Sequence, residues 1–190
     1  MSDITSLAIQ KVTKPNIEDV MPYYLDGDAL KNALDFVAHL RANKMKPSWT
    51  LHNAWKAVNK GKVLYYIRFP VYKSTFFRPY NQNWERSWCV TPYLINIAQY
   101  ENMIADDKLK KIIVDNMYGC EPHSCGDKCS TKNQEIKITI CGTELIRYCH
   151  HVMLGNRSLW ILNPNENEID SIKKMLDFER QVRIENAKRK

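Results

Sequence analysis

The chain has 190 residues, of which 44% are hydrophobic, 11% aromatic and 26% charged, and its formal net charge is +7. This content of bulky apolar residues excludes a wholly disordered chain, and the length fits one folded domain. No run approaches the roughly 18 apolar residues that a membrane helix needs, and Met1–Gln10 lacks the pattern of a secretory signal. We therefore expect a cytoplasmic protein without membrane insertion, in which thiols stay reduced.

The first part of the chain contains one clear helix signal. Residues 1–25 show no regular period, and we expect an N-terminal arm that lies on a single domain spanning 26–190. Asp26 can cap a helix that ends near Asn43, since Pro47 stops any continuation. The apolar residues that recur at helical spacing are Leu30, Ala33, Leu34, Val37 and Leu40.

Aromatic strands follow this helix. Apolar residues at alternate positions would lie on one face of a strand, which favours a half-buried strand. The residues that share this parity are Trp49, Leu51, Trp55 and Ala57. After the turn signal at 59–61, apolar residues alternate again over 63–69, so the two segments predict a β-hairpin. The segment 70–86 predicts a long loop, and 87–93 predicts another strand.

The second half of the chain predicts short elements and one long helix. A short helix is expected over 95–103, and another after the N-cap Asp106. Strands are expected at 136–140, 145–148 and 158–162. Asn165 with Glu168 three residues later resembles a capping box, which would begin a basic C-terminal helix at 165–190.

The order of these elements indicates the fold class. Helix, strands, helix, strands and helix follow one another without regular alternation of strand and helix. The sequence therefore predicts an α+β single domain rather than a doubly wound sheet. We expect a mainly antiparallel sheet packed by the N-terminal helix, a central helical segment and the long C-terminal helix.

The most distinctive chemical feature is a cysteine cluster. Three cysteines, separated by four and three residues, lie in a loop at 119–133 that is rich in Cys, Gly, Pro and Ser. Nineteen further residues separate the third cysteine from a fourth. Zinc prefers four sulfur or nitrogen ligands in a tetrahedron, and two intervening strands would return the last cysteine to the loop. The sequence therefore predicts a structural zinc site with the ligands Cys120, Cys125, Cys129 and Cys149.

Alternatives stay open for this cluster. His123 or His150 can replace one cysteine as a metal ligand. The thiolates can equally hold an iron–sulfur cluster, form a redox-active pair, or pack as small apolar residues in a compact loop. A catalytic zinc would need an open ligand position and a general base, for which Glu121, Glu144 and His151 are available.

Aromatic residues of the predicted strands form a second candidate site. A pocket for a flat or cationic ligand can be lined by Trp49, Trp55, Tyr65 and Trp88. The same side chains would also suit the packing face of the sheet. Cys89, which follows Trp88, is expected to be a packing residue.

Basic residues suggest nucleic acid as a possible partner. Seven basic and three acidic residues lie between Lys173 and Lys190, so this tail has a net charge of +4. Such a tail, together with an aromatic hairpin, can bind nucleic acid, although a solvated helix end has the same pattern. The basic neighbours of the strands are Lys56, Lys60, Lys62, Arg68, Arg78 and Arg86.

Several segments carry a resemblance to a known group of proteins. They are Asp35–Trp49 (DFVAHLRANKMKPSW), Trp55-Lys56, Lys60-Gly61-Lys62, Ser87-Trp88 and the cysteine segment. Over most of residues 26–150 the chain resembles uncharacterised small proteins of clostridia-like anaerobic bacteria, which share a helix, a Trp-bearing hairpin and a later cysteine cluster. The resemblance implies a compact α+β domain of bacterial origin and no activity. The loop 70–86 and the gap after Cys120 depart from the shorter pattern of that group.

These observations rank three functional hypotheses. The sequence has no P-loop, GxGxxG, GxSxG or HExxH motif. The leading hypothesis is a non-enzymatic domain that binds a small molecule or a protein partner and carries a structural zinc. The alternatives are a nucleic-acid-binding protein that uses the basic tail and aromatic hairpin, and a metal- or thiol-dependent enzyme.

Overall fold

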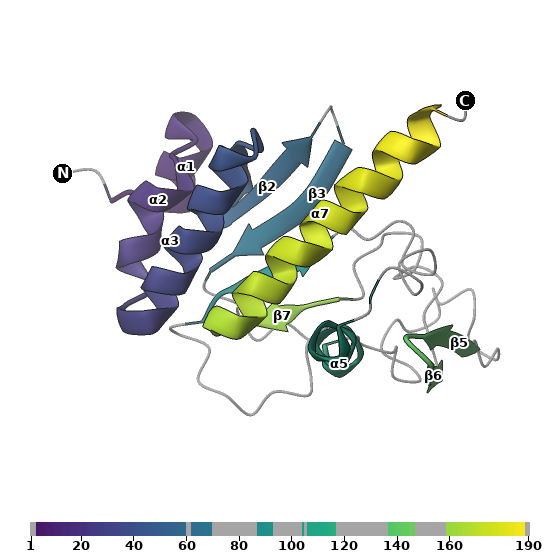
Figure 1. Cartoon of the computed structure of the whole chain (residues 1–190). Helices are drawn as coiled ribbons and strands as arrows, with labels where there is room; N and C mark the ends of the chain where they lie inside the picture. Colours follow the sequence, from purple (N-terminus) through teal and green to yellow (C-terminus); the bar gives the residue numbers. More distant parts are fainter. Residues whose placement is uncertain are drawn as a thin grey trace, which may run out of the picture.

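A five-stranded antiparallel sheet with the order β1-β2-β3-β4-β7 organises the domain (Figure 1). The structure is a computed structural model, and it describes residues 3–59, 62–69, 87–92, 104, 106–116, 137–146 and 159–188. The strands are β1 (Pro47–Leu51), β2 (Ala54–Asn59), β3 (Lys62–Arg68), β4 (Cys89–Pro92) and β7 (Ile161–Leu162). With its long C-terminal helix, the domain confirms the predicted α+β class.

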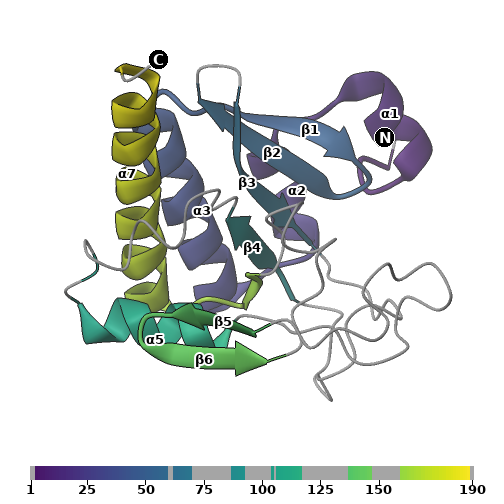
Figure 2. The same ribbon diagram turned by 90° about the vertical axis from the view of Figure 1, so that its right-hand side faces the viewer.

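Two helices, α3 (Gly27–Ala42) and α7 (Glu166–Lys188), lie side by side over one face of this sheet (Figures 1 and 2). A third helix, α5 (Asp107–Asp115), packs against α7. The core lies between the helices and the sheet, where Phe36, Leu40, Tyr65, Ile172 and Leu176 have no exposed surface. Burial of such side chains is the main driving force for holding the layers together.

Helix α3 confirms the predicted helix and differs from it in one detail. Ala33, Val37 and Leu40 of the predicted stripe are buried, as expected. Leu34 lies at the exposed edge of the helix, and Phe36 is buried in its place. The buried residues of α3 still form one stripe at helical spacing, rotated from the predicted one toward Phe36, and Figure 2 shows α3 beside α7 over the sheet.

The predicted N-terminal arm contains short helices. It forms α1 (Leu7–Thr13), α2 (Ile17–Val20) and the 3-10 helix η1 (Met21–Tyr23). Elements of so few residues are too short to show a recognisable helical period. Ile17, Val20 and Met21 are fully buried, so this segment contributes to the core of the domain.

The prediction of one strand through Trp49 and Ala57 is wrong. The chain reverses at His52-Asn53, between β1 and β2, and Asn53 has the positive φ of 52° that asparagine tolerates. Trp49 and Trp55 are directly opposed across this pair of strands, and they share one parity in the sequence because the register shifts between Trp49 and Leu51. The predicted hairpin is confirmed for β2 and β3, which pair from Ala54 to Asn59.

A buried amide fastens this turn to the N-terminal helix. The Gln10 side chain donates to Asn53 Oδ1 (2.6 Å) and to Ile4 O (3.0 Å). Its Oε1 accepts from the Asn53 backbone (2.9 Å) and from Trp49 Nε1 (3.1 Å). Because the Gln10 amide is fully buried, these bonds replace the water that it loses on folding.

A separate hairpin joins β5 (Lys137–Ile140) to β6 (Thr143–Ile146). It confirms the predicted turn at Gly142, which has a positive φ of 73°, although β6 begins two residues before the predicted strand at 145–148. The predicted strand at 158–162 is reduced to β7. The helix predicted at 95–103 lies outside the described residues. No helix within the described residues has the length and apolar character needed to cross a membrane.

Side-chain caps begin α5 and α7, as predicted. Asp106 Oδ1 accepts from the backbone of Lys108 (2.9 Å) at the start of α5. At the start of α7, Asn165 Oδ1 accepts from the Glu168 backbone (3.0 Å), and Glu168 Oε2 accepts from the Asn165 backbone (2.9 Å). This reciprocal capping box fixes the residue at which α7 begins.

Replacing Asn165 with alanine should destabilise the protein by about 1 kcal/mol, because the first turn of α7 loses its capping acceptor. Urea unfolding measures this difference. Asn167→Ala is the matched control, because Asn167 is an exposed residue in the first turn of α7. It should change the free energy of unfolding by much less. Equal effects of the two substitutions would contradict the capping role.

Candidate functional site

The predicted zinc ligands lie outside the described residues. These are Cys120, Cys125, Cys129 and Cys149, with the substitutes His123 and His150. In the parts of the chain that the structure describes, no group of three or more His, Cys, Asp or Glu residues could hold a metal. The zinc site therefore stays a prediction.

The β5–β6 hairpin lies on the chain between Cys129 and Cys149. Lys137 and Ile146 are directly opposed at the open end of the hairpin, so the chain enters and leaves it at neighbouring positions. Along the sequence, Cys129 precedes Lys137 by eight residues, and Cys149 follows Ile146 by three. The chain return on which the predicted ligand set depends is thus present in the structure.

The predicted aromatic pocket residues lie in or beside the hydrophobic core. Trp55, Tyr65 and Trp88 have no exposed surface, and Trp49 is half-buried. Trp55 stacks on Phe69 at a centroid distance of 5.0 Å. Tyr65 meets Phe36 edge-on at 5.6 Å and donates its hydroxyl hydrogen to Ile172 O (3.1 Å). These contacts are those of a packing face, the alternative that the sequence left open.

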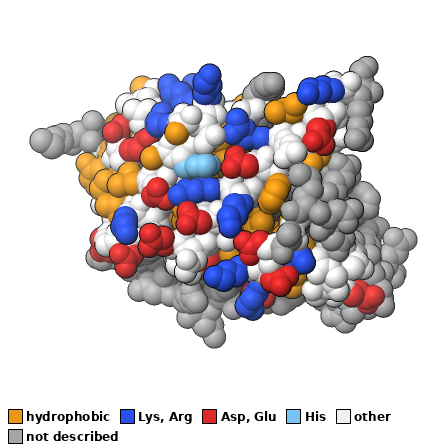
Figure 3. Space-filling view, viewed as in Figure 1, with side chains coloured by type: hydrophobic (Ala, Val, Ile, Leu, Met, Phe, Trp, Pro, Cys, Tyr) orange, Lys and Arg blue, Asp and Glu red, His pale blue; other side chains and the backbone are white. Residues whose placement is uncertain are grey.

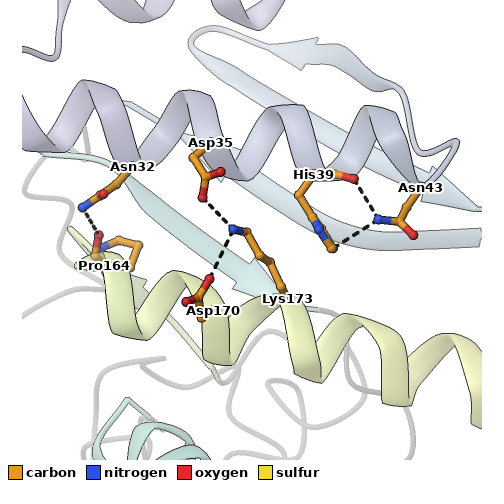
Figure 4. Close-up of polar contacts among 7 residues, drawn as sticks. All are labelled: Asn32, Asp35, His39, Asn43, Pro164, Asp170 and Lys173. Carbon is orange, nitrogen blue, oxygen red and sulfur yellow. Dashed lines mark hydrogen bonds and ion pairs between the residues drawn. The ribbon is translucent and has the colours of Figure 1, made fainter.

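Most basic residues described in α7 are paired with acidic groups. Lys173 Nζ lies 2.6 Å from Asp35 Oδ2 on α3, and Figure 4 shows its side chain between Asp35 and Asp170. The other pairs are Lys174 with Asp106, Arg180 with Asp177, and Arg183 with Glu179. Lys/Arg and Asp/Glu side chains accordingly alternate over the surface of α3 and α7 in Figure 3. Because an unpaired cationic stripe would suit phosphates better, this pairing weakens the nucleic-acid hypothesis.

His39 lies in the polar seam between α3 and α7 (Figure 4). Asn43 Nδ2 donates to the His39 carbonyl oxygen (3.0 Å) and lies 3.4 Å from His39 Nε2. Burial lowers the pKa of His39, because it disfavours the imidazolium form. Asp177 and Asp35 oppose this effect on the pKa, whereas Lys173 and Arg180 reinforce it.

This lowered pKa predicts a loss of stability on mild acidification. The folded state binds a proton at His39 less readily than the unfolded chain, so the stabilisation is present above about pH 6.5 and is lost as the pH falls through the folded-state pKa. Urea unfolding should show a smaller loss between about pH 7.5 and 5.5 for His39→Gln than for the wild type. Ala38→Gln, at an exposed neighbouring position of α3, should keep the wild-type loss. An identical pH dependence in all three proteins would contradict the prediction.

The face of the sheet opposite α3 and α7 carries a different set of residues. Tyr66 and Arg68 alternate with Tyr65 along β3, and they are opposed on β4 by Thr91 and Cys89. The central carbon of the Arg68 guanidinium, Cζ, lies 5.8 Å from the centroid of the Tyr66 ring and 5.4 Å from that of the Trp160 ring. Contacts at these distances are cation–π interactions that hold the guanidinium in place.

Arg68 differs from the other arginines that the structure describes. Arg41, Arg180 and Arg183 each form an ion pair with a carboxylate. No carboxylate among the described residues lies within ion-pair distance of Arg68, and its Nε is buried without a hydrogen-bond acceptor. Leaving a charged donor without a partner costs more than a kilocalorie per mole, so an acceptor at this position would be bound favourably (about 1–3 kcal/mol).

Cys89 lies beside Arg68 and is a poor nucleophile. Burial raises the pKa of its thiol to about 12, although the positive charge of Arg68 and the Thr91 hydroxyl act in the opposite direction. The thiol is therefore protonated at neutral pH, and the thiolate is the reactive form. Cys89 is 1% exposed, which confirms the prediction of a packing residue.

We take Arg68, Tyr66 and Trp160, with Cys89 and Thr91, as the candidate functional site and name it the Arg68 cluster. The sequence indicated Arg68 only as a basic neighbour of aromatic strands. Alternation along β3 is the signal that places Tyr66 beside it. Trp160 was missed, because it immediately precedes β7, and the pairing of β7 with β4 joins segments more than 70 residues apart.

No protein-family model, curated protein or solved structure matches this chain. The resemblance to proteins of clostridia-like bacteria therefore stays a prediction, and the geometry of the described residues supports the functional proposal.

Proposed function

We propose that the chain is a non-enzymatic cytoplasmic domain that binds a small molecule or a protein partner and contains a structural zinc. The observation that carries the binding role is the Arg68 cluster. A cation held against two aromatic rings, with a buried donor that lacks an acceptor, is suited to recognise a ligand. Small-molecule sites commonly combine apolar walls with a few such polar groups.

The chemistry of the cluster favours binding over catalysis. Arginine keeps its proton in proteins, so Arg68 is unsuited to act as a general acid or base. The neighbouring Cys89 is protonated at neutral pH because burial raises its pKa to about 12. Neither group is therefore activated for covalent chemistry.

The zinc proposal is supported by ligand spacing and by the β5–β6 hairpin. Cys120, Cys125, Cys129 and Cys149 supply four soft ligands, which would close the coordination shell and leave no position for substrate. The paired ends of the hairpin, at Lys137 and Ile146, would bring the last ligand back toward the first three. Such a site would fasten the cysteine segment to the hairpin in a reducing compartment.

Protein purified without oxygen should contain about one zinc per chain, because four thiolates bind the ion tightly. Elemental analysis measures the metal, and thiol titration before and after chelation counts the protected cysteines. Cys125→Ser and Cys149→Ser should lose the zinc. Cys141→Ser is the matched control, because Cys141 lies at the turn of the hairpin, away from its open end, and should keep it. A metal-supplemented protein that contains no zinc, or in which chelation frees no additional thiol, would contradict the proposal.

A screen of small fragments tests the binding role. Some of them should raise the melting temperature of the wild type, since a ligand that binds only the folded state stabilises it. The shift should disappear in Trp160→Leu, which removes one ring from Arg68. Tyr23→Leu, at a 65% exposed aromatic residue of η1, should keep it.

Two results would count against binding at the Arg68 cluster. One is a screen in which no fragment shifts the melting temperature. The other is a set of hits that stabilise Trp160→Leu as strongly as the wild type.

A further inference from the structure

The Arg68 cluster contains enough chemistry to name the class of ligand, and this step rests on the proposed binding role. We infer that Arg68 recognises the oxyanion of a small molecule, a carboxylate or a phosphate. The inference follows from the donors that the guanidinium has left, from the pairing of the other arginines, and from the charges on this face of the sheet.

The ring contacts decide which donors of Arg68 remain available. Tyr66 and Trp160 interact with the guanidinium through their rings, at 5.8 and 5.4 Å from Cζ, whereas its N–H groups point outward within its own plane. Nε is among these donors and has no acceptor among the described residues. A group with two oxygen acceptors matches the planar fork of an arginine and can bind it through two parallel hydrogen bonds.

Other arginines that the structure describes donate hydrogen bonds to carboxylates of the protein itself. Arg41 forms two hydrogen bonds with the carboxylate of Glu18, through Nε and Nη2. Arg183 donates to the Glu179 carboxylate and to the Val63 carbonyl oxygen. Arg68 has the same donor geometry without an internal carboxylate among the described residues. An external carboxylate or phosphate would complete the same pattern.

The surroundings of Arg68 favour a negative ligand. The strand residues around Arg68 on its face of the sheet are neutral or basic: Ala54, Lys56, Tyr66, Cys89 and Thr91. Lys56 is opposed to Tyr66 across β2 and β3, so a second cation lies on this face. Since Cys89 is protonated at neutral pH, no negative charge from it competes with a bound oxyanion.

Titration of the full-length protein with three probes of one size tests this inference. Benzoate and phenyl phosphate carry the two oxyanions, and benzamide is a neutral analogue of benzoate. Heteronuclear NMR follows binding. We expect the preferred anion to bind at least about tenfold more tightly than benzamide, because hydrogen bonds to charged groups are worth roughly that factor. The stronger of the two anions identifies the carboxylate or the phosphate as the recognised group.

Substitutions of Arg68 and of a control lysine test whether the anion binds at Arg68. Arg68→Gln should weaken anion binding at least about tenfold, and Arg68→Lys should weaken it less, since it keeps the charge and loses the fork. Lys31→Gln, at an exposed position of α3 on the other side of the sheet, is the matched control for general positive charge and should change the affinity less than about threefold. The far-ultraviolet spectrum and melting temperature of each variant show that it is folded, and Arg68→Lys supplies the test should Arg68→Gln not fold.

The outcomes separate this inference from the proposed function. Equal affinity for benzamide and the anions, or unchanged anion binding in folded Arg68→Gln and Arg68→Lys, would overturn the oxyanion assignment and leave the binding role intact. A protein that binds neither these probes nor any fragment of the screen would remove both. Binding of single-stranded RNA that depends on Arg68, without binding of either small anion, would overturn the inference in favour of nucleic acid.

Discussion

Tyr65 is the residue that joins the sheet to both of the helices that lie over it. From the middle of β3 its ring meets Phe36 of α3, and its hydroxyl group donates to the carbonyl oxygen of Ile172 in α7. Burial raises the pKa of Tyr65 well above its ordinary value, so the hydroxyl keeps the proton that it donates at neutral pH. The position of both helices over the sheet depends on this contact and on the apolar side chains around it.

This arrangement gives the two faces of the sheet different roles. On the helix-covered face, large aromatic side chains such as Trp55 and Tyr65 are buried, and each directs its polar atom to a carbonyl oxygen. On the opposite face, Arg68 is held by rings rather than by a carboxylate. The first face stabilises the fold by burying apolar surface, and Trp55 and Tyr65 satisfy their polar atoms there. The second has donor capacity left over, and we place ligand recognition there.

Local signals in the sequence predicted much of the fold, but they did not predict which strands pair when these lie far apart along the chain. The Asn165–Glu168 capping box and the Asp106 cap were readable because each joins residues only two or three positions apart. The β1–β2 turn was missed, because the register shift between Trp49 and Leu51 gives the opposed Trp49 and Trp55 the same parity, as in a single strand. The Arg68 cluster was only partly visible, since Trp160 reaches it through the pairing of β4 with β7. The cysteine segment was found by composition and spacing, and its geometry is outside the described residues.

The buried amide of Gln10 has a consequence for how the domain unfolds. Through it, α1 satisfies the backbone of Asn53 and the indole of Trp49 at the β1–β2 turn. Detaching α1 would leave these two donors without their acceptor and Asn53 Oδ1 without its donor, and this cost falls on the sheet. The first 25 residues and the strands should therefore separate in one cooperative step, so an early local opening of the N-terminus is energetically disfavoured.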